Sequence, residues 1–286
     1  MARIGVQTST VKGAFAQLGP YEALRRIAGL GYRSVELSQV PMTTESVAEI
    51  RRGLDDHGVE VAALSAMLTA PKGLAVDTLA EDLDKIVEDC RTLGTTMVRI
   101  GMLPLDALVT PGGVAGFAAS ATTYAERLAQ EGIDLYYHNH HVEFARVDGR
   151  SILDVIAEQA PSLGLELDVH WVHRGGHDPV GVLRRYAGRA RLVHLKDYRI
   201  GPLDPSALDL LAAGDGAGFQ SAFYGVVQFA EVGEGTLPWR EIVDTALAGG
   251  AEHLLVEQDD TYGRDPFDSL AMSRDHLQEL GYGHLF

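Results

Sequence analysis

Eight short runs rich in β-branched and aromatic residues alternate with amphipathic helical stretches along the 286-residue chain. The runs cover residues 3–9, 34–38, 59–67, 96–102, 134–139, 163–171, 190–197 and 252–258. Stretches of helical periodicity such as YEALRRIAGLG and TESVAEIRRGLDDHG lie between them, and several close on a glycine, where helices commonly end. Eight strand–helix units in a chain of this length predict an α/β fold, a (β/α)8 TIM barrel, with a doubly wound open sheet as the alternative.

The domain organisation follows from the spacing of these units. No linker rich in proline, serine or charge divides the chain, so we expect one barrel domain over residues 1–286. The spacing is irregular only between the seventh and eighth runs, where residues 198–231 are too many for an ordinary loop. We expect an insertion over the mouth of the barrel there, with a helix in PSALDLLAAG.

Charge and composition exclude several classes of protein. The net charge is -16 and the pI is near 5.0, so a nucleic acid or an anionic membrane surface would be repelled. The start MARIGVQTST lacks the apolar core of a signal peptide, and no stretch approaches the roughly 18 apolar residues of a membrane span. We expect a cytoplasmic protein. Cys90, the only cysteine, is at helical spacing and is expected to face the core without acting as a reactive thiol.

Ionisable residues gather at the C-terminal ends of six of the eight runs. They are Glu36, Arg99, His138, His140, Asp168, His194, Lys196 and Glu257. In a barrel these ends converge on one face, where barrel enzymes carry their active sites. Surface charge placed at random would fall equally often at the opposite ends, so the distribution favours a catalytic site.

Two carboxylates and one imidazole in this set are the strongest candidates for metal ligands. They are Asp168 in LELDVHW, His194 in LVHLKD and Glu257 in LLVEQDD. A fourth ligand is expected from DLYYHNHHVEF, where His138, His140 and Glu143 compete. Carboxylate oxygens with a nitrogen suit Mn²⁺, Mg²⁺ or Co²⁺, and Zn²⁺ is also compatible.

Structural roles compete with these functional ones. Asp168 could cap a following turn, although burying an unpaired carboxylate in an apolar run is costly. Glu257 precedes QDD and could belong to a solvated acidic loop. Glu36 could pair with Arg99 instead of binding a substrate. His138 is expected to be a hydrogen-bonded core histidine more than a ligand.

Several motifs, taken in order, resemble the xylose isomerase-like TIM-barrel superfamily. They are YHNHHVEF, LDVHWV followed by GGHDP, VHLKD, VGEGTLPW and LLVEQD. The resemblance spans nearly the whole chain and is strongest over residues 134–258. The superfamily includes sugar isomerases and epimerases, inosose dehydratases and enzymes described as sugar phosphate isomerase/epimerase.

The resemblance implies both a ligand set and a mechanism. By position, it implies one divalent ion, with Mn²⁺ as the first choice. The ligands of this ion would be Glu143, Asp168, His194 and Glu257. Glu143 and Glu257 would be the catalytic acid–base groups on opposite sides of the substrate, and would move the proton next to a carbonyl. The substrate would be contacted by His140, Lys196, Arg99, Glu36 and Trp171.

The sequence departs from other branches of the superfamily at two positions. Many epimerases end the fifth strand with Glu-Asn-His, whereas here His138 takes the first position and the carboxylate follows at Glu143. Those branches place a histidine where this chain has Trp171. An indole at the mouth suggests stacking on the ring of a glycoside or cyclitol.

Three functions remain compatible with the sequence. We favour a metal-dependent isomerase or epimerase that acts on a keto- or aldo-sugar through an enediolate. A lyase, such as an inosose-type dehydratase or an enzyme of 3-keto-glycoside β-elimination, would begin with the same proton abstraction. A phosphodiesterase resembling abasic-site endonucleases is disfavoured by the negative charge. The resemblance also implies a homo-oligomer with a small carbohydrate as its partner.

Overall fold

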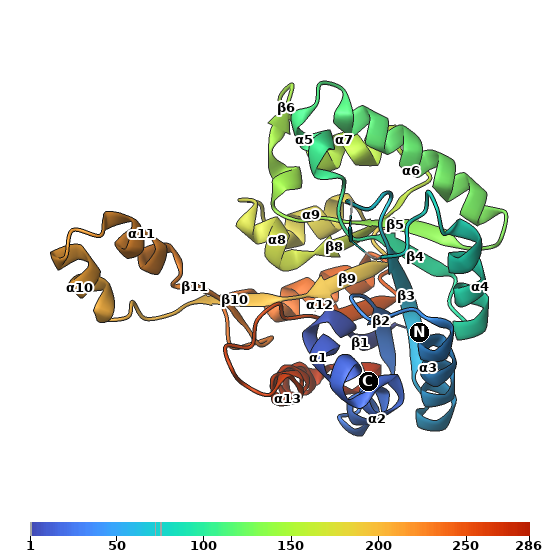
Figure 1. Ribbon diagram of the computed structural model, residues 1–286, viewed down its shortest axis with the longest axis horizontal. Coiled ribbons are helices and arrows are strands. Elements are labelled where there is room, and N and C mark those ends of the chain that lie inside the picture. The colour runs from blue at the N-terminus through green and yellow to red at the C-terminus, as the bar shows by residue number, and fades with distance from the viewer. Residues whose placement is uncertain (1, 72, 75) are drawn as a thin grey trace.

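A closed barrel of eight parallel strands surrounded by helices forms the body of the chain (Figure 1). The computed structural model describes residues 2–71, 73–74 and 76–286. Around the barrel the strands follow the order β1 (Arg3–Gln7), β12 (His253–Val256), β9 (Leu192–Leu195), β8 (Gly164–Asp168), β5 (Asp134–His138), β4 (Met97–Ile100), β3 (Glu60–Ala66) and β2 (Ser34–Leu37). Each strand lies inside one of the eight predicted runs, so the predicted (β/α)8 barrel is confirmed.

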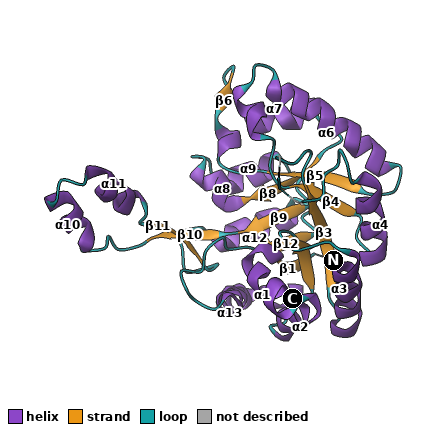
Figure 2. Cartoon of the chain, viewed as in Figure 1, coloured by secondary structure: helices purple, strands orange, loops and turns teal. Residues whose placement is uncertain are grey.

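Helices enclose the barrel, as their alternation with the strands requires (Figure 2). The longer ones are α2 (Pro20–Gly29), α3 (Thr44–His57), α4 (Leu83–Leu93), α6 (Gly113–Ala129), α7 (Ile152–Gln159), α12 (Trp239–Ala248) and α13 (Pro266–Leu277). The shorter ones are α1 (Lys12–Leu18), α5 (Leu105–Val109), α8 (Val169–Arg174) and α9 (Pro179–Arg185). Single turns are η1 (Thr8–Val11), η2 (Val142–Phe144), η3 (Gln278–Tyr282) and η4 (Gly283–Leu285). Among the described residues, no helix combines the length and apolar character needed to cross a membrane.

Local sequence explains where these helices begin and end. The Thr43 hydroxyl accepts the N–H of Ser46 at the start of α3, and Gly58, with a φ of 65°, ends that helix. Cys90 is buried on the core face of α4, as predicted. The sixth run is shorter than predicted, because the Asp168 side chain accepts the N–H of Trp171 and starts α8. The expectation of a strand as far as residue 171 is therefore wrong for its last three residues.

Alternation along the strands builds the barrel interior in layers. A separate apolar layer contains Met97, Tyr136, Leu192 and Leu255. Because side chains two residues apart on a strand share a face, the next inward positions carry Arg99, His138, His194 and Glu257. Gly164 leaves room for the Tyr136 ring, since a Cβ there would lie 2.4 Å from a ring carbon. The polar site thus rests on a packed apolar floor.

The insertion between the seventh and eighth barrel strands forms an arm. Its base is the antiparallel pair β10 (Asp197–Ile200) and β11 (Val227–Ala230), and its tip holds α10 (Ser206–Ala212) and α11 (Gly216–Tyr224). The predicted helix in PSALDLLAAG corresponds to α10. The two helices project away from the barrel, and only the base of the arm lies near its mouth (Figure 1). A smaller hairpin, β6 (Arg146–Val147) and β7 (Arg150–Ser151), follows η2.

A buried carboxylate anchors the base of the arm. Asp197, at the start of β10, accepts the indole N–H of Trp239 at 2.6 Å. It also accepts backbone N–H groups of Gly233, Gly235 and Thr236 at 3.1–3.2 Å. A Cβ at Gly235 would lie 2.1 Å from the carboxylate, so VGEGTLPW needs glycine here. This bonding fixes where the arm leaves the barrel.

Candidate active site

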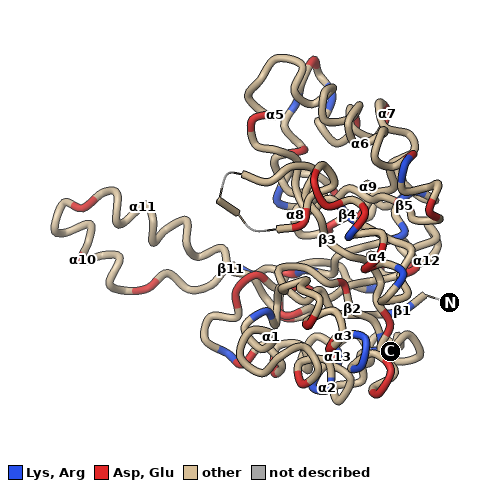
Figure 3. Tube along the Cα trace, turned by 45° about the vertical axis from the view of Figure 1, so that its right-hand side comes forward, with Lys and Arg blue, Asp and Glu red and all other residues tan. Residues whose placement is uncertain are grey.

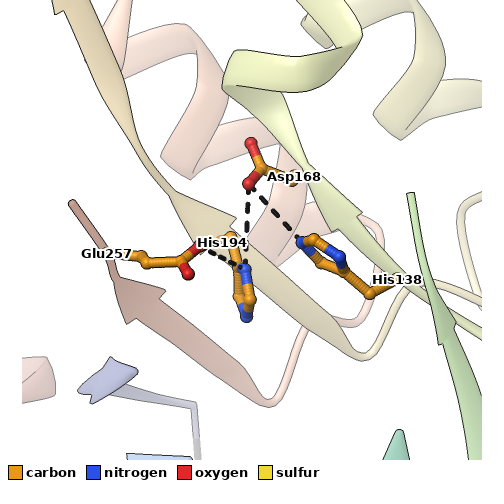
Figure 4. A group of neighbouring side chains, drawn as sticks. All are labelled: His138, Asp168, His194 and Glu257. Carbon is orange, nitrogen blue, oxygen red and sulfur yellow. Dashed lines mark ion pairs between the residues drawn. The ribbon is translucent and has the colours of Figure 1, made fainter. Parts of the chain in front are cut away.

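Four side chains that could ligate a metal ion converge inside the C-terminal end of the barrel (Figure 4). They are His138, Asp168, His194 and Glu257, and one ligand atom of each lies within 4.8 Å of those of the other three. Asp168 Oδ2 is 3.5 Å from His138 Nε2 and 3.8 Å from His194 Nδ1. Glu257 Oε2 is 2.9 Å from His194 Nδ1. Three strand ends and the residue after β12 therefore supply a site with two carboxylates and two imidazoles.

The converging atoms are those that the protein leaves without a hydrogen bond. Nε2 of His138, Oδ2 of Asp168, Nδ1 of His194 and Oε2 of Glu257 are all buried and lack a hydrogen-bond partner. Buried polar atoms are nearly always paired, so four such atoms that face one another indicate a place for a cation. The Lys196 ammonium lies 2.7 Å from Glu257 Oε2 and 3.2 Å from Asp168 Oδ2 without hydrogen-bond geometry. Its position shows the negative potential of the site.

The other polar atom of each carboxylate is held by the protein. Asp168 Oδ1 accepts the N–H of Trp171 at 3.0 Å. Glu257 Oε1 accepts the Gln7 amide at 3.0 Å and the Ser9 hydroxyl at 3.1 Å. These contacts leave the opposite oxygen of each carboxylate directed at the centre, which is how outer partners orient metal ligands.

The two imidazoles are oriented in the same way. His138 Nδ1 lies 3.2 Å from the carbonyl of Gly101. Because a carbonyl only accepts, Nδ1 must carry the hydrogen, and Nε2 therefore presents a lone pair to Asp168. A lone pair that faces a carboxylate at 3.5 Å is unfavourable unless a cation lies between them. The donor set thus fits a divalent ion.

Burial and charge set the protonation of the site. Burial alone would raise the pKa of Asp168, but Lys196 and the neighbouring imidazoles hold it well below its usual value. The pKa of Glu257 is lowered in the same way by Lys196 and His194, against the effect of burial. Burial lowers the pKa of His138 to about 4. At neutral pH the two carboxylates are therefore ionised and His138 is neutral, as metal ligation requires.

A second buried group of charges lies next to His194 on the side away from the ligand centre. Glu36 Oε2 is 3.0 Å from His194 Nε2, and Glu166 Oε1 is 3.2 Å from the same nitrogen. The Arg99 guanidinium pairs with both carboxylates, at 2.8 Å to Glu36 and 3.3 Å to Glu166. Burial and the nearby Glu36 raise the pKa of Glu166 to about 8. Glu36 and Arg99, expected to contact the substrate or to pair with each other, form a buried ion pair.

Aromatic side chains border the ligands on the side of the arm. The Trp171 ring lies 5.6 Å from that of His140 and 6.1 Å from that of Phe229 on β11. Lys196 Nζ is 5.3 Å from the Trp171 ring centre. Burial lowers the pKa of His140 to about 3, and its Nδ1 is buried without a partner. These residues form a neutral, partly aromatic wall with one ammonium group.

Glu143 does not join the four converging residues. It lies on η2, five residues beyond the end of β5, where its carboxylate accepts the hydroxyl of Tyr137 and the backbone N–H of His140. Both carboxylate oxygens are therefore engaged, whereas His138, at the end of the strand itself, points into the barrel. Of the four ligands implied by the resemblance, the structure brings together Asp168, His194 and Glu257, with His138 beside them.

Two polar residues of this region were missed by the sequence reasoning. Glu166 stands two positions before Asp168, so the two-residue repeat of a strand places both on the inner face. The apolar neighbours of Glu166 masked this signal. Gln7 ends the first strand and bonds Glu257, but an amide at a strand end carries no distinctive pattern.

Comparison with known proteins places the chain in a family. A family model described as the xylose isomerase-like TIM barrel matches residues 24–280. The chain belongs to this family. The match confirms the resemblance to the xylose isomerase-like barrel that the sequence motifs indicated. The matched residues include all four converging residues. A search of curated proteins finds no match.

Solved structures similar to this xylose isomerase-like barrel include enzymes of more than one kind. A sugar phosphate isomerase/epimerase from Parabacteroides distasonis ATCC 8503 is 21% identical with a TM-score of 0.66, over 97% of this chain and 94% of that chain. A probable 3-DHS dehydratase from Bacillus anthracis is 14% identical with a TM-score of 0.65, over 97% and 99%. A xylose isomerase-like protein from Mycobacterium smegmatis in complex with magnesium is 14% identical with a TM-score of 0.63, over 100% and 98%. At these identities the similarity establishes the fold alone.

Proposed function

We propose that the chain is a divalent-metal-dependent enzyme that moves the proton next to the carbonyl of a keto- or aldo-sugar, and that it isomerises or epimerises this sugar. The observation that carries the proposal is the convergence of four buried ligand atoms that have no hydrogen-bond partner. The structural relatives include a sugar phosphate isomerase/epimerase and a xylose isomerase-like protein in complex with magnesium.

His138, Asp168, His194 and Glu257 would hold the ion. With two nitrogens and two carboxylate oxygens, this set suits Mn²⁺, Co²⁺ or Zn²⁺ better than Mg²⁺, which prefers oxygen ligands. We propose Mn²⁺ as the native ion. When bound, the ion would polarise the carbonyl of the substrate and so acidify the neighbouring C–H bond.

Glu257 is the proposed base. Its Oε1 is anchored by Gln7 and Ser9, while its Oε2 borders the ligand centre and is ionised at neutral pH. The Lys196 ammonium, beside the same oxygen, can donate hydrogen bonds to the negative oxygen of an enediolate. His140, neutral and with an unpaired Nδ1, can hydrogen-bond a substrate hydroxyl beside this centre.

The charges around the site favour an unphosphorylated substrate. Two of the described lysine and arginine side chains are buried, Arg99 and Lys196, and carboxylates already neutralise both. Asp259, which pairs with Lys196, adds negative charge at the mouth. These carboxylates would repel a phosphate dianion. The Trp171 indole offers a face on which a neutral sugar ring can stack.

A phosphodiesterase acting on nucleic acid finds no support in the surface charge. Acidic residues are spread over the chain, and the arm between residues 201 and 226 carries Asp204, Asp209 and Asp215 but neither lysine nor arginine (Figure 3). A DNA-binding face requires the opposite sign of charge.

A lyase is the second candidate, and one observation favours it. Epimerisation needs acid–base groups on both faces of a carbon, whereas elimination and 1,2-isomerisation can proceed with one. Glu257 has an oxygen without a hydrogen-bond partner 2.7 Å from Lys196 Nζ, while both oxygens of Glu143 are engaged elsewhere. A dehydratase on the same fold is among the structural relatives.

A substrate screen in deuterated buffer tests the proposal. The chain would be stripped of metal, reloaded with Mn²⁺, Co²⁺ or Zn²⁺, and incubated with ketoses, aldoses, inososes and 3-keto-glycosides. NMR after removal of the ion reports both the product and the exchanged proton. We expect metal-dependent deuterium incorporation at a carbon next to a carbonyl, and the product distinguishes isomerase, epimerase and lyase. Equal turnover with and without metal would refute the proposal.

A further inference from the structure

His194 is held between two groups of carboxylates, one at each ring nitrogen. Nδ1 faces Glu257 at 2.9 Å and belongs to the proposed metal centre. Nε2 faces Glu36 Oε2 at 3.0 Å and Glu166 Oε1 at 3.2 Å. The ring is fully buried, so no solvent molecule from outside competes for either nitrogen.

The position of Glu36 is determined by Arg99. Arg99 Nε donates to Glu36 Oε1 at 2.8 Å, and its Nη2 donates to the Ser38 hydroxyl at 3.1 Å. One carboxylate oxygen of Glu36 is thus tied to the guanidinium, and the other is left facing the imidazole. Both Glu36 and Arg99 are buried.

We propose that Glu36, held by Arg99, is a positioning residue that fixes His194 as the Nε2–H tautomer and so presents the lone pair of Nδ1 to the metal ion. An imidazole nitrogen between two carboxylate oxygens is stable there when it carries a hydrogen, and the neutral ring then has its lone pair on the other nitrogen. Carboxylate–histidine–metal arrangements of this kind set both the tautomer and the ring orientation. The inference rests on the proposed metal-dependent function.

Two simpler explanations compete with this role. The Glu36–Arg99 pair could serve only to neutralise charge inside the barrel. Alternatively, Glu36 could attract any cation by its charge, whatever its orientation. Variants that change geometry and charge separately distinguish these explanations.

Glu36→Asp keeps the charge but withdraws the carboxylate from His194 by one methylene. Positioning predicts that Mn²⁺ or Zn²⁺ affinity, measured on the full chain by competition with a chromophoric chelator, falls at least tenfold. Charge attraction alone predicts unchanged affinity, and that result would overturn the proposal.

Arg99→Gln provides the opposite control. It removes a positive charge, so electrostatics alone predicts tighter binding of Mn²⁺ or Zn²⁺, whereas loss of the Glu36 anchor predicts weaker binding. Tighter binding would overturn the proposal. Circular dichroism and melting of the metal-free variants show whether each has folded.

The tautomer can be observed in the unchanged chain, which removes any dependence on the folding of variants. With ¹⁵N-labelled histidine and Zn²⁺ bound, we expect His194 to show a slowly exchanging Nε2–H and a metal-bound Nδ1. The NMR signals of His194 are assigned by their absence from the spectrum of His194→Gln. A metal-bound Nε2 would overturn the inference while leaving the proposed function intact. A wild-type chain that binds no divalent ion would instead refute the proposed function itself.

Discussion

The choice between His138 and Glu143 as the fourth ligand has a measurable consequence for stability. His138→Asn keeps a polar group near the Gly101 carbonyl but removes the nitrogen that faces Asp168. Loss of a partner that only orients a ligand lowers metal affinity by about 10- to 100-fold. We therefore expect removal of the ligand itself to lower Mn²⁺ affinity by about 100-fold. Glu143→Gln should leave affinity nearly unchanged, because its carboxylate is engaged by Tyr137 and His140.

The expected size of the effect follows from binding linkage. At a Mn²⁺ concentration of about 100 times the wild-type Kd, binding stabilises the folded chain by about 2.7 kcal/mol. A 100-fold weaker variant at the same concentration gains about 0.4 kcal/mol. For a chain of this size about 2 °C in Tm corresponds to 1 kcal/mol, so the metal-induced rise in Tm should drop from about 5 °C to about 1 °C.

Calorimetry with and without Mn²⁺ measures this rise directly. His141→Asn is the matched control, since the same change is made three residues away on an exposed side chain. The control and Glu143→Gln should retain the wild-type rise in Tm. If His138→Asn retained the full rise while Glu143→Gln lost it, the ligand set taken from the structure would be wrong and the set implied by the sequence resemblance would stand.

Three further predictions concern catalysis, cysteine reactivity and pH. Fully metallated Glu257→Gln should bind a substrate analogue but lose about 10² to 10⁴ in the rate of deuterium incorporation; a wild-type rate would exclude Glu257 as the base. Burial, with a smaller effect of Asp89, raises the pKa of the Cys90 thiol to about 12, so native protein at pH 8 should not react with a disulfide reagent until urea unfolds it. Metal affinity should increase from pH 6 to above pH 8 with release of protons, measured calorimetrically in two buffers of different ionisation enthalpy; an affinity independent of pH would contradict this.

The barrel could be predicted because its signals are local and repeated. Each strand run is short, mostly apolar and followed by a helical stretch, and charges at the C-terminal ends of six runs mark the functional face. Asp168 and His194 were therefore found from their own strands, and Glu257 from the residue that follows its strand. The outer ends of strands were misjudged at the sixth strand, where the side chain of Asp168 starts a helix, and at the first strand, where Thr8 and Ser9 belong to η1.

The fourth ligand could not be predicted in the same way, because it depends on the path of a turn. In DLYYHNHHVEF, three side chains can reach the barrel mouth, and sequence spacing does not say which one does. The structure shows that η2 directs the Glu143 carboxylate toward Tyr137, leaving His138 as the inward residue of β5. The direction of the arm could not be predicted from the sequence either, since it depends on hydrogen bonds between Asp197 and residues 36 or more positions away.

The charge balance inside the barrel explains why protons and a divalent ion compete for this site. Four carboxylates occupy two adjacent layers: Glu36, Glu166, Asp168 and Glu257. Two buried cations oppose them, Arg99 and Lys196, which leaves two negative charges uncompensated when all four are ionised. Without an ion, protons make up the difference: burial and Glu36 raise the pKa of Glu166 to about 8, and the carboxylates around His194 outweigh its burial and raise its pKa well above the usual value. A divalent ion supplies the same two positive charges, so both protons can leave when it binds. Since protonation opposes binding, affinity rises with pH until these groups are deprotonated and levels off above that range.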